Sequence, residues 1–322
     1  MDLLKLQEEL REKALQRTRA EKAANKANAP AAGAVKGPII DFRYRPNTKS
    51  IIGGIAESPI FRAGLIANGV DIDEFYGRAR TMPEIIADLK EHNVIKAVIV
   101  GRDAETTYGY KPNNPEIRQF VQACPEIFLG YYGVDPHKGM QAIRDLDAAV
   151  KSGDFHGAAM DPMYAQLKSS DAKMYPVYAK CCELNIPIVI TAGPARYTAN
   201  TVMDYTHPSE IDIVAKDFPD LKIIISHGAW PFVDEMIGVT FRNRNVFLEI
   251  SEYEEYPGAS DFLDAAKTIL KDQMLFASAC PFVPYLEAAE KYTTYGFDAE
   301  TYEKIMWKNA AKVLGLETSE GG

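Results

Sequence analysis

The chain has 322 residues, of which 47% are hydrophobic and 25% are charged, as in ordinary soluble globular proteins. Its net charge of −9 argues against binding to nucleic acid or to an anionic membrane surface, and no apolar run reaches the roughly 20 residues of a membrane span. The charged N-terminus lacks the apolar stretch of a secretory signal, and the four cysteines have neither zinc-site nor disulfide-framework spacing, so we expect a cytoplasmic protein with reduced thiols.

Residues 1–37 differ in composition from the rest of the chain. Leu3, Leu6 and Leu10 recur at helical spacing among charged residues, which predicts a short amphipathic helix. A linker rich in alanine and asparagine follows. This extension either frays in solution or packs on a neighbouring subunit, and we expect a homo-oligomer.

From residue 38 to 322, short apolar strands alternate with longer amphipathic helices. The expected strands are Ile39–Arg43, Ala97–Gly101, Ile127–Gly133, Gly157–Met160, Ile188–Thr191, Ile223–Ser226, Val246–Ile250 and Met274–Ser278. The expected helices are Met82–His92, Glu116–Cys124, Met140–Lys151, Ala172–Leu184, Pro208–Asp217, Phe232–Phe241, Asp261–Leu270, Val283–Lys291 and Ala299–Leu314. Uniformly apolar strands between helices indicate a parallel sheet, and eight such units predict an α/β fold of the (β/α)₈ TIM-barrel type.

Two sequence features bear on the contents of the site. Residues 46–81 form a long insert after the first strand, and a loop of that length is usually functional or a lid. The glycine-rich dinucleotide-binding motif is missing after the first strand, so we expect no nucleotide cofactor.

Active sites of such barrels form at the carboxyl ends of the strands. Arg43 and Arg45 stand at positions i and i+2 after the first strand, so both should point into the same mouth. Guanidinium groups are fixed positive charges with a fork geometry that suits carboxylate or phosphate. Alternatively, the two arginines are structural and pair with Asp161, Glu249 or Glu252.

His227 ends the sixth strand and is placed to exchange protons with a substrate near neutral pH. The alternative is a neutral histidine that hydrogen-bonds to the backbone. Asp161, after the fourth strand, is a candidate base or a counter-ion for the arginines, and Glu252, after the seventh strand, is a candidate assistant in the proton transfer.

Other residues at the strand ends are candidates for binding substrate. They are Tyr44, Tyr164, Thr191, Trp230 and Cys280. The aromatic side chains suit a flat organic acid, although any one of them also suits plain packing. A free cysteine such as Cys280 is more often a small buried hydrophobic residue than a nucleophile.

Several segments resemble the amidohydrolase-2 branch of the amidohydrolase superfamily, which includes decarboxylases of the aminocarboxymuconate semialdehyde type and lactone hydrolases. The resemblance runs from about residue 38 to 316. It is carried by IIDFRYRP (39–46), IPIVITAG (186–193), DFPDLKIIISHG (217–228), MLFASACPF (274–282) and NAAKVLGL (309–316).

The chain departs from this family where the family binds metal. Arg43 and Arg45 replace the two histidines of the H-x-H pattern, Thr191 replaces the histidine that ends strand five, and Ala279 replaces the aspartate after strand eight. His227 is the one residue of this pattern that remains. One ligand cannot hold a zinc-type ion and two arginines repel it, so we expect no catalytic divalent metal.

These observations predict a metal-independent amidohydrolase-family enzyme that acts on a small organic acid. Arg43 and Arg45 would bind the anionic group and His227 would act as acid or base, with Asp161 or Glu252 assisting. The resemblance favours hydrolysis of a lactone, ester or amide. Decarboxylation, or another lyase or isomerase step, is the alternative reaction, and a non-catalytic ligand-binding barrel is the alternative class.

Overall fold

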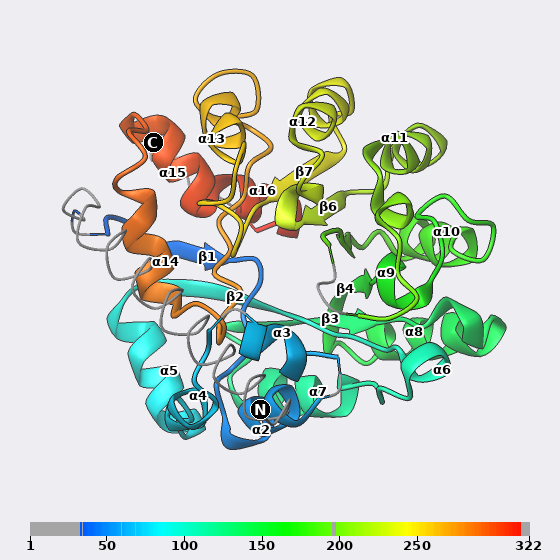
Figure 1. Ribbon diagram of the computed structural model, residues 1–322, viewed down its shortest axis with the longest axis horizontal. Coiled ribbons are helices and arrows are strands. Elements are labelled where there is room, and N and C mark those ends of the chain that lie inside the picture. Colours follow the sequence, from blue (N-terminus) through cyan, green and yellow to red (C-terminus); the bar gives the residue numbers. More distant parts are fainter. Residues whose placement is uncertain (1–32, 34, 59, 68, 195–197, 317–322) are drawn as a thin grey trace, which may run out of the picture.

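Seven parallel strands form one sheet in which each strand pairs with the next along the chain (Figure 1). The computed structural model describes residues 33, 35–58, 60–67, 69–194 and 198–316, so the predicted N-terminal helix lies outside the described residues. The strands are β1 (Ile39–Asp41), β2 (Val94–Val100), β3 (Phe128–Gly133), β4 (Phe155–Met160), β5 (Ile188–Thr191), β6 (Ile223–Ser226) and β7 (Val246–Glu249). This order confirms the predicted α/β barrel-like architecture.

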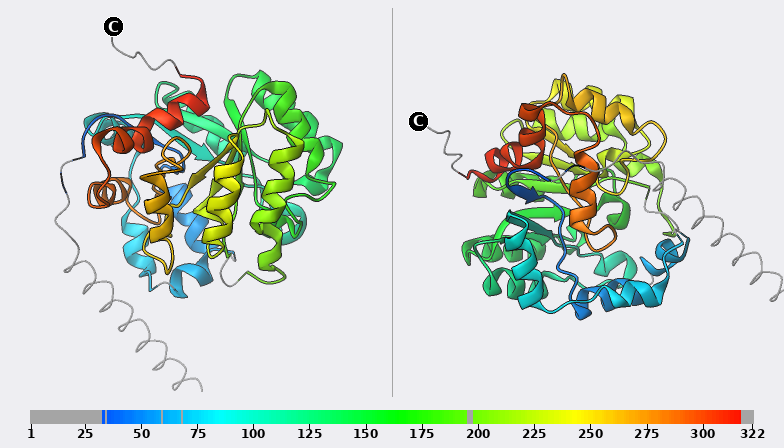
Figure 2. Two further views of the ribbon diagram at one scale, coloured as in Figure 1. Left: turned by 90° about the horizontal axis from the view of Figure 1, so that it is seen from above. Right: turned by 90° about the vertical axis from the view of Figure 1, so that its left-hand side faces the viewer.

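Helices lie around the outside of the curled sheet (Figures 1 and 2). Those that connect successive strands are α5 (Met82–Glu91), α7 (Asn114–Ala123), α8 (Met140–Lys151), α10 (Tyr175–Leu184), α11 (Pro208–Asp217) and α12 (Val233–Arg242), and α13 (Ser260–Ala266) follows β7. Short helices α6 (Glu105–Tyr108) and α9 (Pro162–Ala165) follow β2 and β4. After α14 (Tyr285–Tyr292) the described residues continue through α15 (Ala299–Glu303), a π-helical turn (Lys304–Lys308) and α16 (Asn309–Leu314). Within the described residues, no helix is long and apolar enough to span a membrane.

Local sequence signals explain where several helices begin and end. Thr81 and Glu84 form a reciprocal capping box at the start of α5, and Pro83 stands in its first turn. Asn185 ends α10 in the left-handed conformation that asparagine tolerates. The start of α5 and the end of α10 therefore match the helix boundaries predicted from the sequence.

The expected eighth strand is only partly formed, which corrects one prediction. Residues 274–278 run beside β7 through one parallel bridge between Leu248 and Met274, and the Phe42 N–H donates to the Phe276 carbonyl at 3.0 Å. The N–H of Phe276 donates instead to Ile305 and that of Ser278 to the Asp41 carboxylate. Because these two N–H groups do not bond to a neighbouring strand, the segment lies between β7 and β1 without forming a regular strand.

The core has two layers, one inside the curled sheet and one between the sheet and its helices. Ile40, Phe42, Val98, Tyr131 and Ile224 belong to the inner layer, and α16 packs against it. The outer layer contains most of the buried aliphatic side chains of the helices. Burial of both faces explains why the strands read as uniformly apolar.

The insert after β1 is helical, not a loop as we predicted. It contains α2 (Lys49–Glu57), α3 (Arg62–Ala67) and α4 (Ile72–Gly77). Thr48 caps α2 by accepting from the Ile51 N–H, and Asp71 caps α4. In Figure 1 these helices lie along one side of the sheet, with α4 near α5 and α2 near α7.

Candidate active site

A pocket opens at the carboxyl ends of the strands, where the insert meets the barrel. It has about 780 Å³ of empty space, including its open mouth. Its lining residues are Arg43, Arg45, Ile60, Phe61, Gly64, Leu65, Arg102, Asp161, Met163, Tyr164, Thr191, Gly193, His227, Glu252, Tyr253 and Phe282. Charged groups therefore come from the strand ends, whereas the insert supplies an apolar cover of Ile60, Phe61 and Leu65.

Arg43 is a buried cation at this pocket, with 2% of its surface exposed. Its Nη1 lies 3.5 Å from the Thr191 hydroxyl oxygen, and its Nε has no hydrogen-bond partner among the described residues. Burial lowers the pKa of Arg43, and the charge of Glu249 opposes that effect. An unpaired buried guanidinium nitrogen is costly, so this position favours an anionic ligand.

Arg45 faces the same pocket, as the spacing of the two arginines predicted. Its Nη1 is buried without a hydrogen-bond partner among the described residues, and its guanidinium lies 5.7 Å from the centre of the Phe282 ring. Burial, followed by the like charges of Arg43 and Arg102, lowers the pKa of Arg45 to about 9. It remains a cation at neutral pH, and a nearby anion would relieve the repulsion.

A third arginine, Arg102, is paired within the protein. Its Nε and Nη2 donate to the two oxygens of Asp161 at 3.0 and 2.7 Å, a bidentate geometry. The guanidinium is also 4.9 Å from the Phe61 ring centre and 4.6 Å from that of Tyr164. Burial opposes ionisation of Asp161, but the charge and hydrogen bonds of Arg102 prevail and lower its pKa. Asp161 is thus a counter-ion of Arg102 and a poor base.

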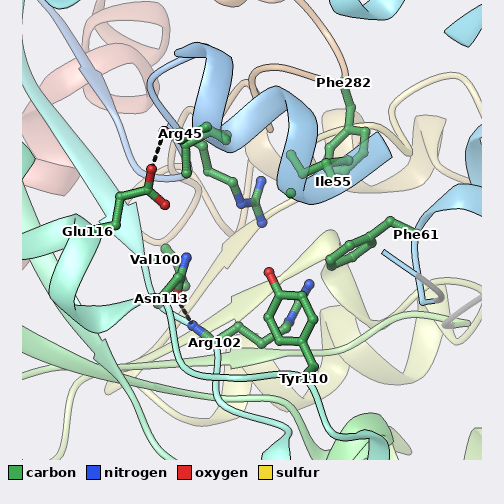
Figure 3. Close-up of a pocket in the computed structure, with 13 residues that line it drawn as sticks. Arg45, Ile55, Phe61, Val100, Arg102, Tyr110, Asn113, Glu116 and Phe282 are labelled. Atoms are coloured by element: carbon green, nitrogen blue, oxygen red, sulfur yellow. Dashed lines mark hydrogen bonds between the residues drawn. The ribbon is translucent and has the colours of Figure 1, made fainter. Parts of the chain in front are cut away.

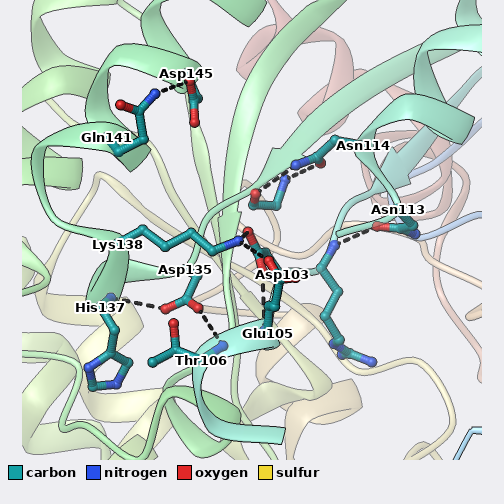
Figure 4. A network of polar contacts seen from close by, with 12 residues as sticks. Asp103, Glu105, Thr106, Asn113, Asn114, Asp135, His137, Lys138, Gln141 and Asp145 are labelled. Carbon is teal, nitrogen blue, oxygen red and sulfur yellow. Dashed lines mark hydrogen bonds and ion pairs between the residues drawn. The ribbon is translucent and has the colours of Figure 1, made fainter. Parts of the chain in front are cut away.

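A polar network fixes the loop that carries Arg102 (Figure 4). The Arg102 N–H donates to Asn113 at 2.8 Å, and Lys138 donates to Asp103 and Glu105 at 2.7 and 2.9 Å. Asp135 accepts from the backbone N–H of Thr106 and of His137. These bonds link the segments after β2 and β3, so Arg102 is held from both sides.

His227 follows β6 and is neutral at physiological pH. Its Nδ1 lies 2.8 Å from the Ser251 carbonyl oxygen, and because a carbonyl only accepts, Nδ1 carries the hydrogen. Burial and the charge of Arg43 hold the pKa of His227 well below its usual value. The free lone pair is therefore on Nε2, which lies 3.9 Å from a Glu252 oxygen.

Glu252 is the carboxyl group in the pocket that can change charge near neutral pH. Burial raises its pKa to about 7, although Arg43 and Arg45 act in the opposite direction. Its side chain is 29% exposed, so it can exchange protons with solvent. A group with these properties can store and deliver one proton.

The backbone is strained where these residues meet the site. His227, Glu252 and Ala279 have φ values of +64°, +69° and +57°, although none is a glycine. They follow β6, β7 and the eighth segment respectively. Non-glycine residues in this region cost about 1–3 kcal/mol each and concentrate at functional sites.

Two buried carboxylates hold these strand ends in the same way. Asp41 accepts from the N–H of Arg43 and of Ser278, both at 3.0 Å. Glu249 accepts from the Ser226 hydroxyl and, at 2.9 Å, from the Ser251 N–H. The turn closed by Asp41 spans the inward-facing Phe42 and ends at Arg43, which lines the pocket.

Three of the predicted substrate-binding residues lie away from the pocket lining. Tyr44 packs in the outer core against Phe128 and Tyr285, with ring centres 6.3 and 6.1 Å away. Cys280 is buried, and burial raises its thiol pKa, so it is a poor nucleophile. Trp230 stacks beside the pocket on Tyr253 and Tyr256. Tyr164 and Thr191 do line the pocket.

Sequence reasoning gave no role in the site to Arg102, Phe61 or Phe282. Arg102 directly follows β2, so the strand-end rule that singled out Arg43 also applied to it. Phe282 lies a few residues after the segment 274–278, so the strand-end rule pointed to it less strongly. Phe61 had no such signal, because its place in the pocket depends on how the insert packs.

The donor atoms do not fit a divalent metal of the kind that the resemblance implies. The family positions for metal hold Arg43, Arg45, Thr191 and Ala279 beside His227. Both oxygens of Asp161 are bound to Arg102. The described residues contain no group of three or more His, Cys, Asp or Glu side chains arranged to hold a metal.

Comparisons with known proteins agree with this architecture. An uncharacterised TIM-barrel protein from Bordetella bronchiseptica is 26% identical, with a TM-score of 0.69 over 87% of this chain and 99% of that one. A dihydroxybenzoic acid decarboxylase from a Polaromonas species, with bound manganese, is 17% identical (TM-score 0.59; 88% and 99% covered). A 5-carboxyvanillate decarboxylase from Novosphingobium aromaticivorans, complexed with manganese, is 16% identical (TM-score 0.62; 89% and 99% covered).

A search of curated proteins found no match. The amidohydrolase family profile matches residues 76–316, which include every strand from β2 onward and leave Arg43 and Arg45 outside the match. That range spans most of the chain. The chain therefore belongs to the amidohydrolase family.

Proposed function

We propose that this chain is a metal-independent enzyme that decarboxylates a small, flat organic acid. The observation that carries the proposal is the pair of buried guanidinium nitrogens, Arg43 Nε and Arg45 Nη1, which have no partner among the described residues. Both arginines line a pocket that has aromatic walls and a carboxyl group of near-neutral pKa, Glu252. An organic anion satisfies the cations, and its apolar body fits the walls.

Each group has a role that its geometry supports. Arg43 and Arg45 hold the substrate anion as fixed, preorganised charge. Glu252, protonated in part at neutral pH, is the proton donor. His227 orients the acid or substrate through its Nε2 lone pair, since its Nδ1–H is committed to Ser251. Asp161 keeps Arg102 in place.

The proposed reaction needs no water as nucleophile. Glu252 transfers its proton to the carbon that bears the carboxylate, the bond between that carbon and the carboxylate breaks, and carbon dioxide leaves. The electron pair of the broken bond returns to the organic body. Glu252, now ionised, takes a proton from solvent, so the net change is one carboxylate and one proton to one C–H bond and one carbon dioxide.

Hydrolysis of a lactone or ester is the second candidate, and one observation favours it. His227 lines the pocket with its Nε2 lone pair free, and an anionic substrate would offset the charge of Arg43, which together with burial lowers the pKa of His227. Solved structures of similar fold include decarboxylases of aromatic acids, and this likeness supports the order in which we place the two reactions.

Carbon dioxide release tests the proposal. We expect the purified, chelator-treated protein to release carbon dioxide from an aromatic acid such as 2,6-dihydroxybenzoate, and the product made in D₂O to carry deuterium at the vacated carbon. Arg43→Gln should lower kcat/KM on the order of 100-fold, as loss of one preorganised charge does elsewhere. Arg118→Gln, which removes a half-exposed arginine outside the pocket lining, is the matched control and should retain activity.

Three results would contradict parts of this proposal. Acid release without carbon dioxide from an ester or lactone panel would favour hydrolysis. Stoichiometric manganese or zinc in active protein would refute metal independence. Organic-acid binding without turnover of any tested class would support a non-catalytic barrel.

A further inference from the structure

Thr191 ends β5 and lies between two charged groups of the pocket. The register of β4 and β5 pairs Met160 with Ile190, so the next residues along these strands, Asp161 and Thr191, stand side by side. The Thr191 hydroxyl oxygen also lies 3.5 Å from Arg43 Nη1. In the described part of the chain, no direct hydrogen bond or ion pair joins Arg43 to Asp161. The threonine hydroxyl is therefore the group that connects them.

The hydrogen bonds around the Thr191 hydroxyl run in one direction. A guanidinium only donates, so the hydroxyl oxygen accepts from Arg43 and its own hydrogen is left for another acceptor. That acceptor is the Asp161 carboxylate. Burial raises the pKa of Asp161, the charge of Arg102 lowers it, and the hydrogen bond from Thr191 lowers it as well. A hydroxyl that donates to a carboxylate is polarised and becomes a better acceptor in return, so the two bonds strengthen each other.

Asp161 is held rigidly enough to fix the position of this hydroxyl. Arg102 donates to its two oxygens at 3.0 and 2.7 Å. Figure 3 shows the Arg102 side chain extending toward Phe61, whose ring centre lies 4.9 Å from the guanidinium. Because a carboxylate offers about four lone-pair sites, the two bonds from Arg102 leave room for a third donor.

Arg43 depends on this contact more than a paired arginine would. The bond to Thr191 is the one hydrogen bond that its side chain makes to the described residues, and its buried Nε has no partner among them. An arginine side chain has many rotamers, and a cation that binds an anion must be held in one of them. Loss of the hydroxyl would leave the charge of Arg43 in the pocket but release its orientation.

We propose that Thr191 is a positioning residue, whose hydroxyl links Arg43 to the Asp161–Arg102 pair and fixes the guanidinium that binds the substrate anion. This inference rests on the proposed organic-acid function and adds a residue that acts through Arg43. The linked group contains two guanidinium cations and one carboxylate. One net positive charge therefore remains for the ligand.

Calorimetric titration of the full-length protein with benzoate tests this role. Thr191→Val replaces the hydroxyl by a methyl group of similar size, and we expect it to weaken benzoate binding about ten-fold, as loss of a hydrogen bond to a charged group does. Thr191→Ser restores the hydroxyl and should recover most of this loss. Thr191→Ala removes the hydroxyl without adding a methyl group beside Asp161 and should repeat the loss, so the test does not depend on one variant.

A double-mutant cycle shows whether Thr191 acts through Arg43. In an Arg43→Gln background, Thr191→Val should change benzoate affinity less than about two-fold, because the group that the hydroxyl positions has already been removed. The kcat/KM for carbon dioxide release from 2,6-dihydroxybenzoate should follow the same pattern across the four proteins of the cycle.

Thr240→Val is the matched control. Thr240 is fully buried on α12, outside the pocket lining, and its hydroxyl donates to the Met236 carbonyl at 2.8 Å. This substitution also removes a hydrogen-bonded, buried threonine hydroxyl. It should leave benzoate affinity unchanged, which separates the loss of a buried hydrogen bond from the loss of a positioned arginine.

The outcomes separate this inference from the proposed function. If Arg43→Gln weakens benzoate binding but Thr191→Val does not, the positioning role is refuted and the organic-acid function stands. If Thr191→Ser binds as weakly as Thr191→Val, or if Thr191→Val has its full effect in the Arg43→Gln background, the link through the hydroxyl to Arg43 is refuted. If the wild-type protein neither binds benzoate nor releases carbon dioxide from 2,6-dihydroxybenzoate, both proposals fail.

Discussion

At the scale of single residues, the pocket contains three arginines with different partners. Arg102 is neutralised by a bidentate bond to Asp161, whereas Arg43 and Arg45 each retain a buried nitrogen without a described partner. The sequence showed the arginines and the carboxylates but not which of them pair. We expect the Arg102–Asp161 pair to matter for stability, whereas the function proposed above depends on Arg43 and Arg45.

The Arg102–Asp161 pair should contribute strongly to stability. Both side chains are at least 90% buried, so Asp161→Asn leaves a buried cation without its counter-ion. We expect the free energy of unfolding to fall by about 3 kcal/mol, measured by urea denaturation. Glu74→Gln, which breaks the exposed pair with Arg78, is the control and should change it by less than about 1 kcal/mol. A similar small loss for both variants would contradict a buried, exclusive pair.

At the scale of elements, the site depends on where strands end and how closely they approach. The Arg102 segment crosses β3 at Gly101 and Gly133, where a Cβ atom would collide with backbone atoms of the other segment. Asn114 seals this crossing by bonding both the N–H and the carbonyl of Gly133. The close crossing places Arg102 at the pocket.

Substitution of Gly133 should therefore disturb both stability and the pocket. A methyl group there would meet the backbone nitrogen of Arg102. Backbone atoms cannot move aside as the end of a flexible side chain can. We expect Gly133→Ala to lower the free energy of unfolding by about 1–3 kcal/mol and to weaken benzoate binding, measured by denaturation and calorimetry.

Gly54→Ala is the matched control for this substitution. It adds the same methyl group inside helix α2, where the new Cβ has open space. It should stabilise the protein by about 0.5–1 kcal/mol, because alanine favours helix more than glycine does. An equally stable Gly133→Ala protein would show that β2 and β3 are not so closely packed.

At the scale of the whole molecule, buried carboxyl groups should make stability depend on pH. Burial raises the pKa of Asp41 to about 6, of Glu252 to about 7 and of Glu254 to about 8. A group whose pKa is raised on folding binds its proton more tightly in the native state. It therefore stabilises the fold at low pH and loses that contribution as the pH rises through its folded pKa.

Thermal denaturation across pH 5 to 8 tests this expectation. The Tm of the wild-type protein should fall across this range as these groups ionise. Glu252→Gln cannot ionise at this position, so its Tm should fall less steeply between pH 6 and 8. Carboxylates with lowered pKa values, such as Asp161, titrate below this window and do not obscure it. Parallel pH curves for the two proteins would place the ionisation of Glu252 outside this range.

The sequence by itself determined the order of the seven strands, the barrel-like α/β architecture and the convergence of Arg43, Arg45, His227 and Glu252. It could do so because hydrophobic periodicity sets the elements, and parallel strands bring their carboxyl ends to one edge. The spacing of Arg43 and Arg45 predicted that both side chains point into the same pocket. A turn at Asp41 nevertheless lies between the two arginines and the end of β1.

Only the tertiary structure decided which charges are paired, that the insert is helical and covers the site, and that the eighth segment is irregular. Ion pairing depends on distances between residues that are far apart in sequence, such as the 59 positions between Arg102 and Asp161. The tautomer of His227 likewise depends on a carbonyl 24 residues away. These choices follow from packing across the barrel, which no local pattern records, and they leave Arg43 and Arg45 each with a buried nitrogen that has no hydrogen-bond partner among the described residues.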